Sequence, residues 1–407
     1  MITINDKKDC MGCYACLNIC PQKCIFMDSA NEGFWYPRVD YNNCVKCGLC
    51  IKVCPTINKV ELRQNYDVKA YACKNKNNDI RLKSSSGGLF TLLAEQVIDK
   101  GGIVFGAGFD KNFAVIHSYV ETKDGLGKFR GSKYVQSKIG NTYKQAMDFL
   151  VKGRDVLFTG TPCQIAGLEN YLGQNYDNLL CQDIICHGVP SPMVWEEYMV
   201  LREKKARATI ESVSFRNKIK GWKEYSLLIV YENGIKYSHT IHDDMYLVGF
   251  NNSLYLRPSC YDCSYKTKQR QSDITLADFW GAQNVLPEMD DDKGISLVLI
   301  HSSKGQKAFD KIKDKMIMKQ VDFKDAVKYN PAMIKSVKIN PSREKFFAKL
   351  NVIEFSVLMK KHCTVKLVIR IKRKIKNAIK KMLICLGLFD LVKKVYYRIK
   401  NQQTIIV

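Results

Sequence analysis

The stretch Cys10-Met-Gly-Cys13-Tyr-Ala-Cys16-Leu-Asn-Ile-Cys20-Pro21 decides the fold of the N-terminal part of this 407-residue chain. The same spacing, Cys-x2-Cys-x2-Cys-x3-Cys-Pro, returns between Cys44 and Pro55, with cysteines at Cys44, Cys47, Cys50 and Cys54. Nine of the 17 cysteines lie before residue 55. A small thiol-rich unit that contains an internal repeat therefore opens the chain.

The doubled run has the spacing of bacterial ferredoxins, in which thiolates hold [4Fe–4S] clusters and the fourth cysteine of each run binds the other cluster. The repeat thus predicts one cluster on Cys10, Cys13, Cys16 and Cys54, and a second on Cys44, Cys47, Cys50 and Cys20. Structural zinc is the alternative, although zinc sites rarely carry eight cysteines in this doubled run. Cys24 lies outside both runs and is expected to be an ordinary buried thiol.

Composition limits the class of protein. The chain is 46% apolar and 26% charged, as in ordinary globular proteins, and carries a net charge of +24. No apolar run reaches the roughly 18–20 residues that cross a bilayer, and no signal peptide precedes the first cysteine. We therefore expect a cytoplasmic protein whose cysteines bind metal or carry out redox chemistry.

From residue 68 to 320, strand patterns alternate with helical ones, which predicts α/β architecture. Asn233-Gly234 predicts a hairpin between 227–232 and 235–240. The other expected strands are 68–74, 103–109, 115–121, 155–159, 179–185 and 296–301, and the expected helices are 88–100, 141–152, 163–172, 192–204 and 304–315.

Six segments of this region are recognisable together, in the following order: Ser84-Ser-Ser-Gly-Gly88, Gly131-Ser-Lys-Tyr-Val-Gln-Ser137, Phe158-Thr-Gly-Thr-Pro-Cys-Gln-Ile-Ala-Gly-Leu168, Asp183-Ile-Ile-Cys-His-Gly-Val-Pro-Ser-Pro192, Ser259-Cys-Tyr-Asp-Cys263 and Ser272-Asp-Ile-Thr-Leu-Ala-Asp-Phe-Trp-Gly281. They resemble the coenzyme F420 hydrogenase/dehydrogenase beta-subunit family over roughly residues 1–320. Family members usually have Gly where this chain has Ala277. The resemblance implies an oxidoreductase with FAD on an α/β core and an iron–sulfur cluster close by.

The residues themselves also favour a core cluster. Cys163 and Cys186 each follow an expected strand, and Cys260 and Cys263 form a Cys-x2-Cys loop, so four thiolates could converge on one [4Fe–4S] site. The alternative is that Cys163 and Cys186 are buried core thiols and that only Cys260 and Cys263 have a functional role.

For FAD, the candidates are the glycine- and hydroxyl-rich turns. Ser85, Ser86, Gly87 and Gly88 open a helix, where free N–H groups favour phosphate, and Lys133 could add charge to a pyrophosphate. Ser132, Thr159 and Thr161 complete this set, and a plain helix cap is the alternative for its first four residues. His187 is the candidate proton donor, against a hydrogen-bonded structural role.

The expected function is that of an iron–sulfur flavoprotein. It couples hydride exchange between FAD and a deazaflavin such as F420, or another organic substrate, to one-electron transfer through [4Fe–4S] clusters. The alternative is a non-catalytic relay subunit that docks on a partner redox enzyme or ferredoxin. Nucleic-acid binding is not expected, because the positive charge is concentrated in one tail.

The expected fold is therefore α+β. It comprises a ferredoxin-like domain at 1–57, a larger α/β flavin and iron–sulfur core at 68–320, an extension at 321–358 and a basic helical tail at 359–407. Between Lys360 and Lys400 there are 14 Lys or Arg and one acidic residue. Apolar residues recur every three or four positions at Leu367, Ile371, Ile375, Ile379, Met382 and Leu386. This pattern favours peripheral contact with an anionic membrane, and packing on the chain itself or on a partner is the alternative.

Overall fold

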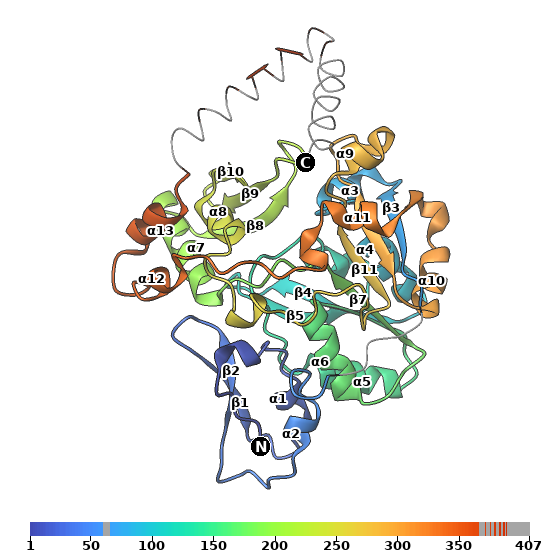
Figure 1. Ribbon diagram of the computed structural model, residues 1–407, viewed down its shortest axis with the longest axis vertical. Helices are drawn as coiled ribbons and strands as arrows, with labels where there is room; N and C mark the ends of the chain where they lie inside the picture. The colour runs from blue at the N-terminus through green and yellow to red at the C-terminus, as the bar shows by residue number, and fades with distance from the viewer. Residues whose placement is uncertain are drawn as a thin grey trace, which may run out of the picture. The chain divides into compact units, whose positions relative to one another are not determined.

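The computed structural model describes residues 1–59 and 66–365, and, from the tail, Ile371, Ile375, Ala378, Ile379, Met382, Leu383, Leu386 and Leu388. The chain divides into two compact units, Met1–His362 and Cys363–Val407. The first unit contains the three sheets labelled in Figure 1, and every candidate site residue lies within its bounds.

Two short helices and a hairpin form the N-terminal segment. They are α1 (Ala15–Ile19), β1 (Ile25–Ser29), β2 (Trp35–Val39) and α2 (Leu49–Lys52), and the hairpin strands pair antiparallel. The sequence repeat is also a backbone repeat. Gly12 and Tyr14 have positive φ before α1, and Lys46 and Gly48 have positive φ before α2. These left-handed residues reverse the chain direction within each cysteine loop.

A mixed eight-stranded sheet forms the centre of the unit. Its order is β13-β3-β12-β11-β7-β6-β4-β5. The four strands β11, β7, β6 and β4 are parallel to their neighbours within that group, so their carboxyl ends meet at one edge. The strands are β3 (Lys69–Asn75), β4 (Ile103–Phe109), β5 (Val115–Val120), β6 (Val156–Thr159), β7 (Leu179–Ile184), β11 (Ile274–Asp278), β12 (Ser296–Ile300) and β13 (Met316–Val321).

Helices cover both faces of this sheet. α4 (Leu89–Ile98) and α10 (Ser303–Asp310) pack against one face, on Val104, Leu157 and Leu180. α5 (Thr142–Val151) and α6 (Pro162–Leu172) pack against the other, on the alternate residues Ile103, Val156 and Leu179. Tyr14, Ala15 and Val53 of the N-terminal segment belong to this second cluster. The thiol-rich segment is therefore seated on the helical layer of α5 and α6.

A second, three-stranded sheet has the order β10-β9-β8. Its strands are β8 (Ile210–Asn217), β9 (Ser226–Tyr231) and β10 (Lys236–Thr240). Gly234 has a φ of +80° between β9 and β10, as the Asn-Gly turn predicts. The remaining helices are α3 (Asn78–Lys83), α7 (Pro192–Ala206), α8 (Met245–Asn251), α9 (Ala282–Val285), α11 (Phe323–Lys328), α12 (Arg343–Phe347) and α13 (Phe355–Cys363).

The predicted fold class is confirmed: a ferredoxin-like segment precedes a larger mixed-sheet core. One predicted helix, 304–315, is wrong at its end. α10 stops at Asp310, and a 3-10 turn leads directly into β13. The chain must become extended there because Met316 pairs with Asn75 of β3.

Most of the predicted tail, including the basic residues Lys366, Arg370, Arg373, Lys374, Lys376, Lys380 and Lys381, lies outside the described residues. Of the apolar stripe, Ile371, Ile375, Ile379, Met382 and Leu386 are described, and each is 47–60% exposed. Residues 60–65, between the ferredoxin-like segment and β3, are not described either. In the described part of the chain, no helix combines the length and apolar character needed to cross a bilayer.

Candidate iron–sulfur and flavin sites

Two open cavities lie in the N-terminal segment and separate its eight motif cysteines into two groups. One cavity is lined by Cys10, Cys13, Cys16 and Cys54, and is called the inner cavity below. The other is lined by Cys20, Cys44, Cys47 and Cys50, and is called the outer cavity because Cys47 is exposed. The fourth cysteine of each run therefore crosses to the other group, as the repeat predicts.

Cys24 also lines the outer cavity. It is buried, and its Sγ lies 3.4 Å from the Sγ of Cys20. This contact, together with burial, raises the pKa of the Cys24 thiol to about 12. Cys24 is thus a buried thiol, as expected from the sequence, but it is in contact with one of the predicted cluster ligands.

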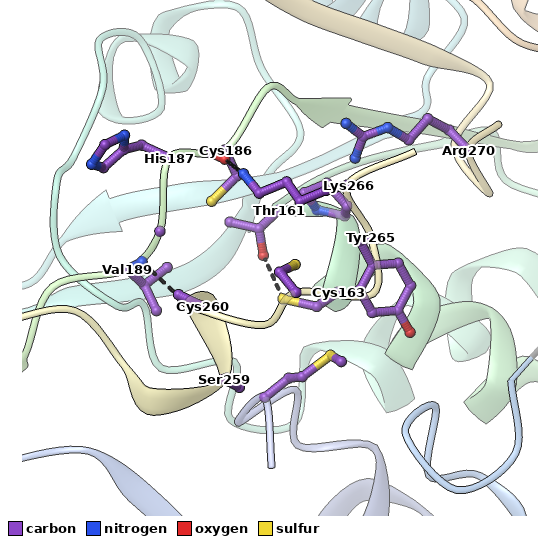
Figure 2. A pocket seen from close by; sticks show the side chains of 14 residues that line it. Thr161, Cys163, Cys186, His187, Val189, Ser259, Cys260, Tyr265, Lys266 and Arg270 are labelled. Atoms are coloured by element: carbon purple, nitrogen blue, oxygen red, sulfur yellow. Dashed lines mark hydrogen bonds between the residues drawn. The ribbon is translucent and has the colours of Figure 1, made fainter. Parts of the chain in front are cut away.

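A third open cavity lies at the carboxyl edge of the parallel strands. Cys163 follows β6 at the start of α6, and Cys186 follows the adjacent strand β7. Cys260 ends a 3-10 turn, Pro258–Cys260, and Cys263 follows it. All four line this core cavity, and Figure 2 shows the sulfur atoms of Cys163 and Cys186 facing a common space.

Charge in the core cavity suits a metal-bound set of thiolates. Burial raises the pKa of Cys163 to about 12 and also raises the pKa of Cys186 and Cys260. The Lys266 ammonium, which donates hydrogen bonds to Cys186 O and Ala332 O, opposes that rise at Cys186. Cluster binding would therefore have to displace protons from these thiols, and Lys266 and Arg270 are the cations lining the cavity.

Each of the three cavities is lined by at least four cysteines. Four thiolates are the ligand set of a [4Fe–4S] cluster, and structural zinc accepts the same set. Among the residues that the structure describes, no group of three or more His, Cys, Asp or Glu side chains is arranged to hold a metal ion.

The inner and core cavities are neighbours. Met11, between Cys10 and Gly12, lines both. Tyr265 lines the core cavity, and its hydroxyl lies 3.5 Å from the carbonyl oxygen of Pro55, which lines the inner one. Neither contact could be predicted from the sequence, because no motif joins residues so far apart in the chain.

The flavin candidates lie in two places. Ser85 and Ser132 meet, with their hydroxyl oxygens 2.9 Å apart, and the Ser132 N–H donates to Ser85 Oγ. Lys133 is close by in the sequence, and its ammonium donates to the carbonyl oxygen of Lys128 over 2.7 Å. Burial lowers the pKa of Lys133 to about 7.

The glycine turn is bonded within the protein. Gly88 has a φ of +84° and forms the N-cap of α4. The Gly87 N–H donates to Ser296 Oγ, and Ser86 Oγ donates to the carbonyl oxygen of Ile295. The described contacts of this turn therefore resemble a helix cap more than an open phosphate cradle.

The two threonines lie nearer the core cavity. Thr159 ends β6 and donates to the carbonyl oxygen of Phe105. Thr161 lines the core cavity, with its hydroxyl oxygen 3.2 Å from Cys163 Sγ. The structure thus separates the set predicted for FAD into the Ser85–Ser132 contact and the cavity margin. Their role in FAD binding stays a prediction.

Two cations at the end of β8 contact the serine turn: buried Arg216 lies within the strand and half-buried Lys218 follows it. Arg216 forms a bidentate ion pair with Asp278, at 2.6 and 2.9 Å, and donates to the carbonyl oxygen of Ser85. Lys218 donates to the carbonyl oxygen of Ser86 over 2.7 Å. Both side chains therefore fix the backbone of the turn.

His187 lies on the rim of the core cavity, but Figure 2 shows its ring directed away from the thiols. Its Nε2 is 3.1 Å from Ser253 Oγ, and the ring packs edge-on against Phe250. Burial lowers its pKa to about 4, so the imidazole is neutral near pH 7. These contacts suit a structural histidine, and the proton-donor role stays a prediction.

Two protein families match separate parts of the chain. A family described as the carboxyl-terminal part of the beta subunit of coenzyme F420 hydrogenase/dehydrogenase matches residues 153–352, and a 4Fe-4S dicluster domain matches residues 9–58. Among solved structures, a chain of the xenon-derivatised F420-reducing [NiFe] hydrogenase complex from Methanosarcina barkeri is 17% identical, with a TM-score of 0.43. The match covers 70% of this chain and 89% of that one. No curated protein matches.

Proposed function

We propose that this chain, which belongs to the coenzyme F420 hydrogenase/dehydrogenase beta-subunit family, is an iron–sulfur flavoprotein oxidoreductase. Its substrate would be a deazaflavin or another reducible organic molecule. When bound, the [4Fe–4S] clusters supply one-electron transfer, and FAD supplies exchange between one-electron and two-electron chemistry. The dicluster domain accounts for two clusters, and the core cluster and FAD are part of the proposal.

The observation that carries the proposal is the sharing of Met11 by the inner and core cavities. Tyr265 and the Pro55 carbonyl oxygen form a second bridge between them. Groups held in these two cavities would be separated by a few side chains, which is the arrangement that a chain of electron carriers requires. The outer cavity, where Cys47 is exposed, lies at the surface end of this series.

The residues have distinct proposed roles. The inner and outer cysteine sets would each hold one cluster, and the core set would hold a third. Lys266 and Arg270 offset the charge of the core thiolates. Ser85, Ser132 and Lys133 would position FAD, and Arg216 and Lys218 fix the backbone beside them.

A relay subunit without flavin is the second candidate. It is favoured by one observation: the Gly87 N–H, the Ser85 and Ser132 hydroxyls and the Lys133 ammonium are all hydrogen-bonded within the protein. In that case the substrate would be converted by a partner redox subunit, and this chain would only move electrons.

Anaerobic purification followed by iron, sulfide and flavin analysis tests both candidates. The proposal predicts about 12 iron, about 12 sulfide and one flavin per chain, because each cubane holds four of each atom. A content of about eight iron atoms per chain would show that the core cluster is absent. A full iron content without flavin would contradict the enzyme proposal and favour the relay subunit. Bleaching of flavin absorbance by reduced F420, reduced ferredoxin or NADH, tested one at a time, then identifies the class of electron donor.

We propose separately that the protein is cytoplasmic and that its tail contacts the surface of an anionic membrane. The exposed Ile371, Ile375 and Ile379 support it, together with the surplus of basic residues in the sequence. Full-length protein should co-sediment with vesicles of anionic lipid, and high salt should release it. Replacing those three isoleucines with serine should abolish binding. Equal binding by the wild-type protein and the triple serine variant would contradict the proposal.

A further inference from the structure

Arg257 lies at the junction between the ferredoxin-like segment and the core, and its side chain is fully buried, with 0% exposure. Its Nε donates to the carbonyl oxygen of Cys10 over 2.8 Å. Its two terminal nitrogens donate to Gln136 Oε1 and to the carbonyl oxygen of Trp35, each over 3.0 Å. One guanidinium therefore joins the first cysteine loop, the N-terminal hairpin and the core.

The packing around this guanidinium is close. Tyr36 covers it at 4.3 Å from the ring centroid. On another side lies Gly12, where an added Cβ would stand 2.9 Å from Arg257 Nη1. Gly12 has a φ of +66°, so the cysteine loop passes the cation at a point where only glycine allows both the backbone conformation and the approach.

The backbone of Arg257 also supports the core thiols. Its carbonyl oxygen accepts a hydrogen bond from the Cys260 N–H over 2.9 Å, and its own N–H donates to the carbonyl oxygen of Val189. The Val189 N–H in turn lies 3.4 Å from Cys260 Sγ, as a donor to the sulfur. The same residue thus fixes one ligand loop of the inner cavity through its side chain and one of the core cavity through its main chain.

The charge of Arg257 lacks a carboxylate partner among the described residues. Two other buried arginines are paired with carboxylates: Arg216 with Asp278, and Arg270 with Asp183. A buried cation is costly unless an opposite charge offsets it. The candidates for that opposite charge are the thiolates that face the inner and core cavities.

We infer that Arg257 is a positioning residue that offsets the negative charge of the cluster held by Cys10, Cys13, Cys16 and Cys54, and so raises its reduction potential. The inference rests on the proposed function, since it requires a cluster in the inner cavity. Each one-electron reduction adds a negative charge to the cluster. A fixed cation beside the Cys10 loop, shielded from water, therefore stabilises the reduced form more than the oxidised one.

The test is a redox titration of the full-length, iron-loaded protein, followed by the paramagnetic signals of the reduced clusters. R257Q keeps a hydrogen-bonding group but removes the charge, and R257K keeps the charge. We expect R257Q to disfavour reduction of one cluster about tenfold, which is a shift of 59 mV to more negative potential for a one-electron couple. R257K should stay closer to wild type, and the outer cluster should not shift in either variant.

A second variant tests the same inference in case R257Q folds poorly. Gln136→Glu has nearly the same shape and places a carboxylate next to the Arg257 guanidinium. It should lower the same potential. The matched control is the double variant E32Q/R343Q, which removes another contact of the N-terminal hairpin without changing net charge. Its potentials should equal those of wild type.

The outcomes separate the inference from the proposed function. Wild-type protein without iron in the inner cavity would overturn both. Wild-type potentials in fully loaded R257Q or Q136E would overturn the inference alone. An equal shift in E32Q/R343Q would also overturn it, because the effect would then come from docking of the hairpin and not from the charge of Arg257.

Discussion

Gly167, in the middle of α6, lies close against Cys13 of the N-terminal segment, and we predict that Gly167→Ala destabilises the protein. A Cβ at this position would stand 2.9 Å from Cys13 Cβ, 3.1 Å from Cys13 Sγ and 3.0 Å from Tyr143 Oη. Such distances force neighbours to move. Tyr143 is fully buried and donates to the carbonyl oxygen of Gln164 over 2.7 Å, so it cannot turn away without losing that bond.

Two effects oppose each other in this substitution. Alanine is favoured over glycine inside a helix by about 1 kcal/mol. Overpacking a filled site costs about 1–3 kcal/mol, and a lost hydrogen bond adds about 1 kcal/mol. The crowding should therefore outweigh the gain, with a net loss of roughly 1–3 kcal/mol by these magnitudes.

The assay compares apo protein and iron-loaded protein by thermal unfolding and iron content. The midpoint of the apo variant should fall by about 1–4 °C, because the unfolding entropy that divides this loss grows with chain length. Iron should fall by up to about four atoms per chain, because Cys13 is displaced. Gly127→Ala is the matched control, since a Cβ there meets open space. If Gly167→Ala unfolds no earlier than wild type and keeps full iron, the packing of Cys13 on α6 is refuted.

Three other predictions concern the core cavity and the buried charges. Cys260→Ser should lower iron by about four atoms per chain and leave the ferredoxin-type signals in place, because the core and N-terminal sites share no ligands; unchanged iron would exclude the core cluster. Burial would raise the pKa of Asp291, but its bidentate contact with Arg81 outweighs burial and lowers it. Wild type should therefore lose stability relative to Asp291→Asn as pH falls below about 4, where the unfolded carboxylate takes up its proton; parallel stability curves would contradict this. Burial lowers the pKa of Lys133 to about 7, so the stability of apo wild type should rise relative to Lys133→Met between about pH 7 and pH 10, and a flat difference would show that the ammonium is solvated.

The sequence was most informative about features that depend on residues close together in the chain. The doubled cysteine run predicts two groups of four cysteines, and the two cavities of the N-terminal segment are lined by the same groups, with Cys20 and Cys54 in the crossed positions. Runs of β-branched and aromatic residues predicted β4 (Ile103–Phe109) with its observed bounds. Cys163 and Cys186 could be paired because each follows a strand, and neighbouring parallel strands bring such ends together.

The remainder depends on contacts between residues far apart in the chain. Arg257 and Cys10 are 247 positions apart, and no periodicity links them. β13 was not predicted because Met316–Val321 lacks a strict alternation of apolar and polar residues, and its extended form comes from pairing with β3. The turn at Ser85–Gly88 was interpreted from its composition alone. Its hydrogen bonds to Ile295 and Ser296 were not visible in the sequence.

Cluster loading and docking of the N-terminal segment should depend on each other, for an electrostatic reason. Without metal, burial raises the pKa of Cys13, so this thiol stays protonated and Arg257 has no carboxylate partner among the described residues. Metal binding to the N-terminal cysteines removes the proton and supplies the opposite charge that the buried guanidinium lacks. The Cys10 loop, which Arg257 contacts directly, is therefore held more strongly in the loaded protein than in the apo protein. The cluster thus contributes to the stability of the junction as well as to electron transfer.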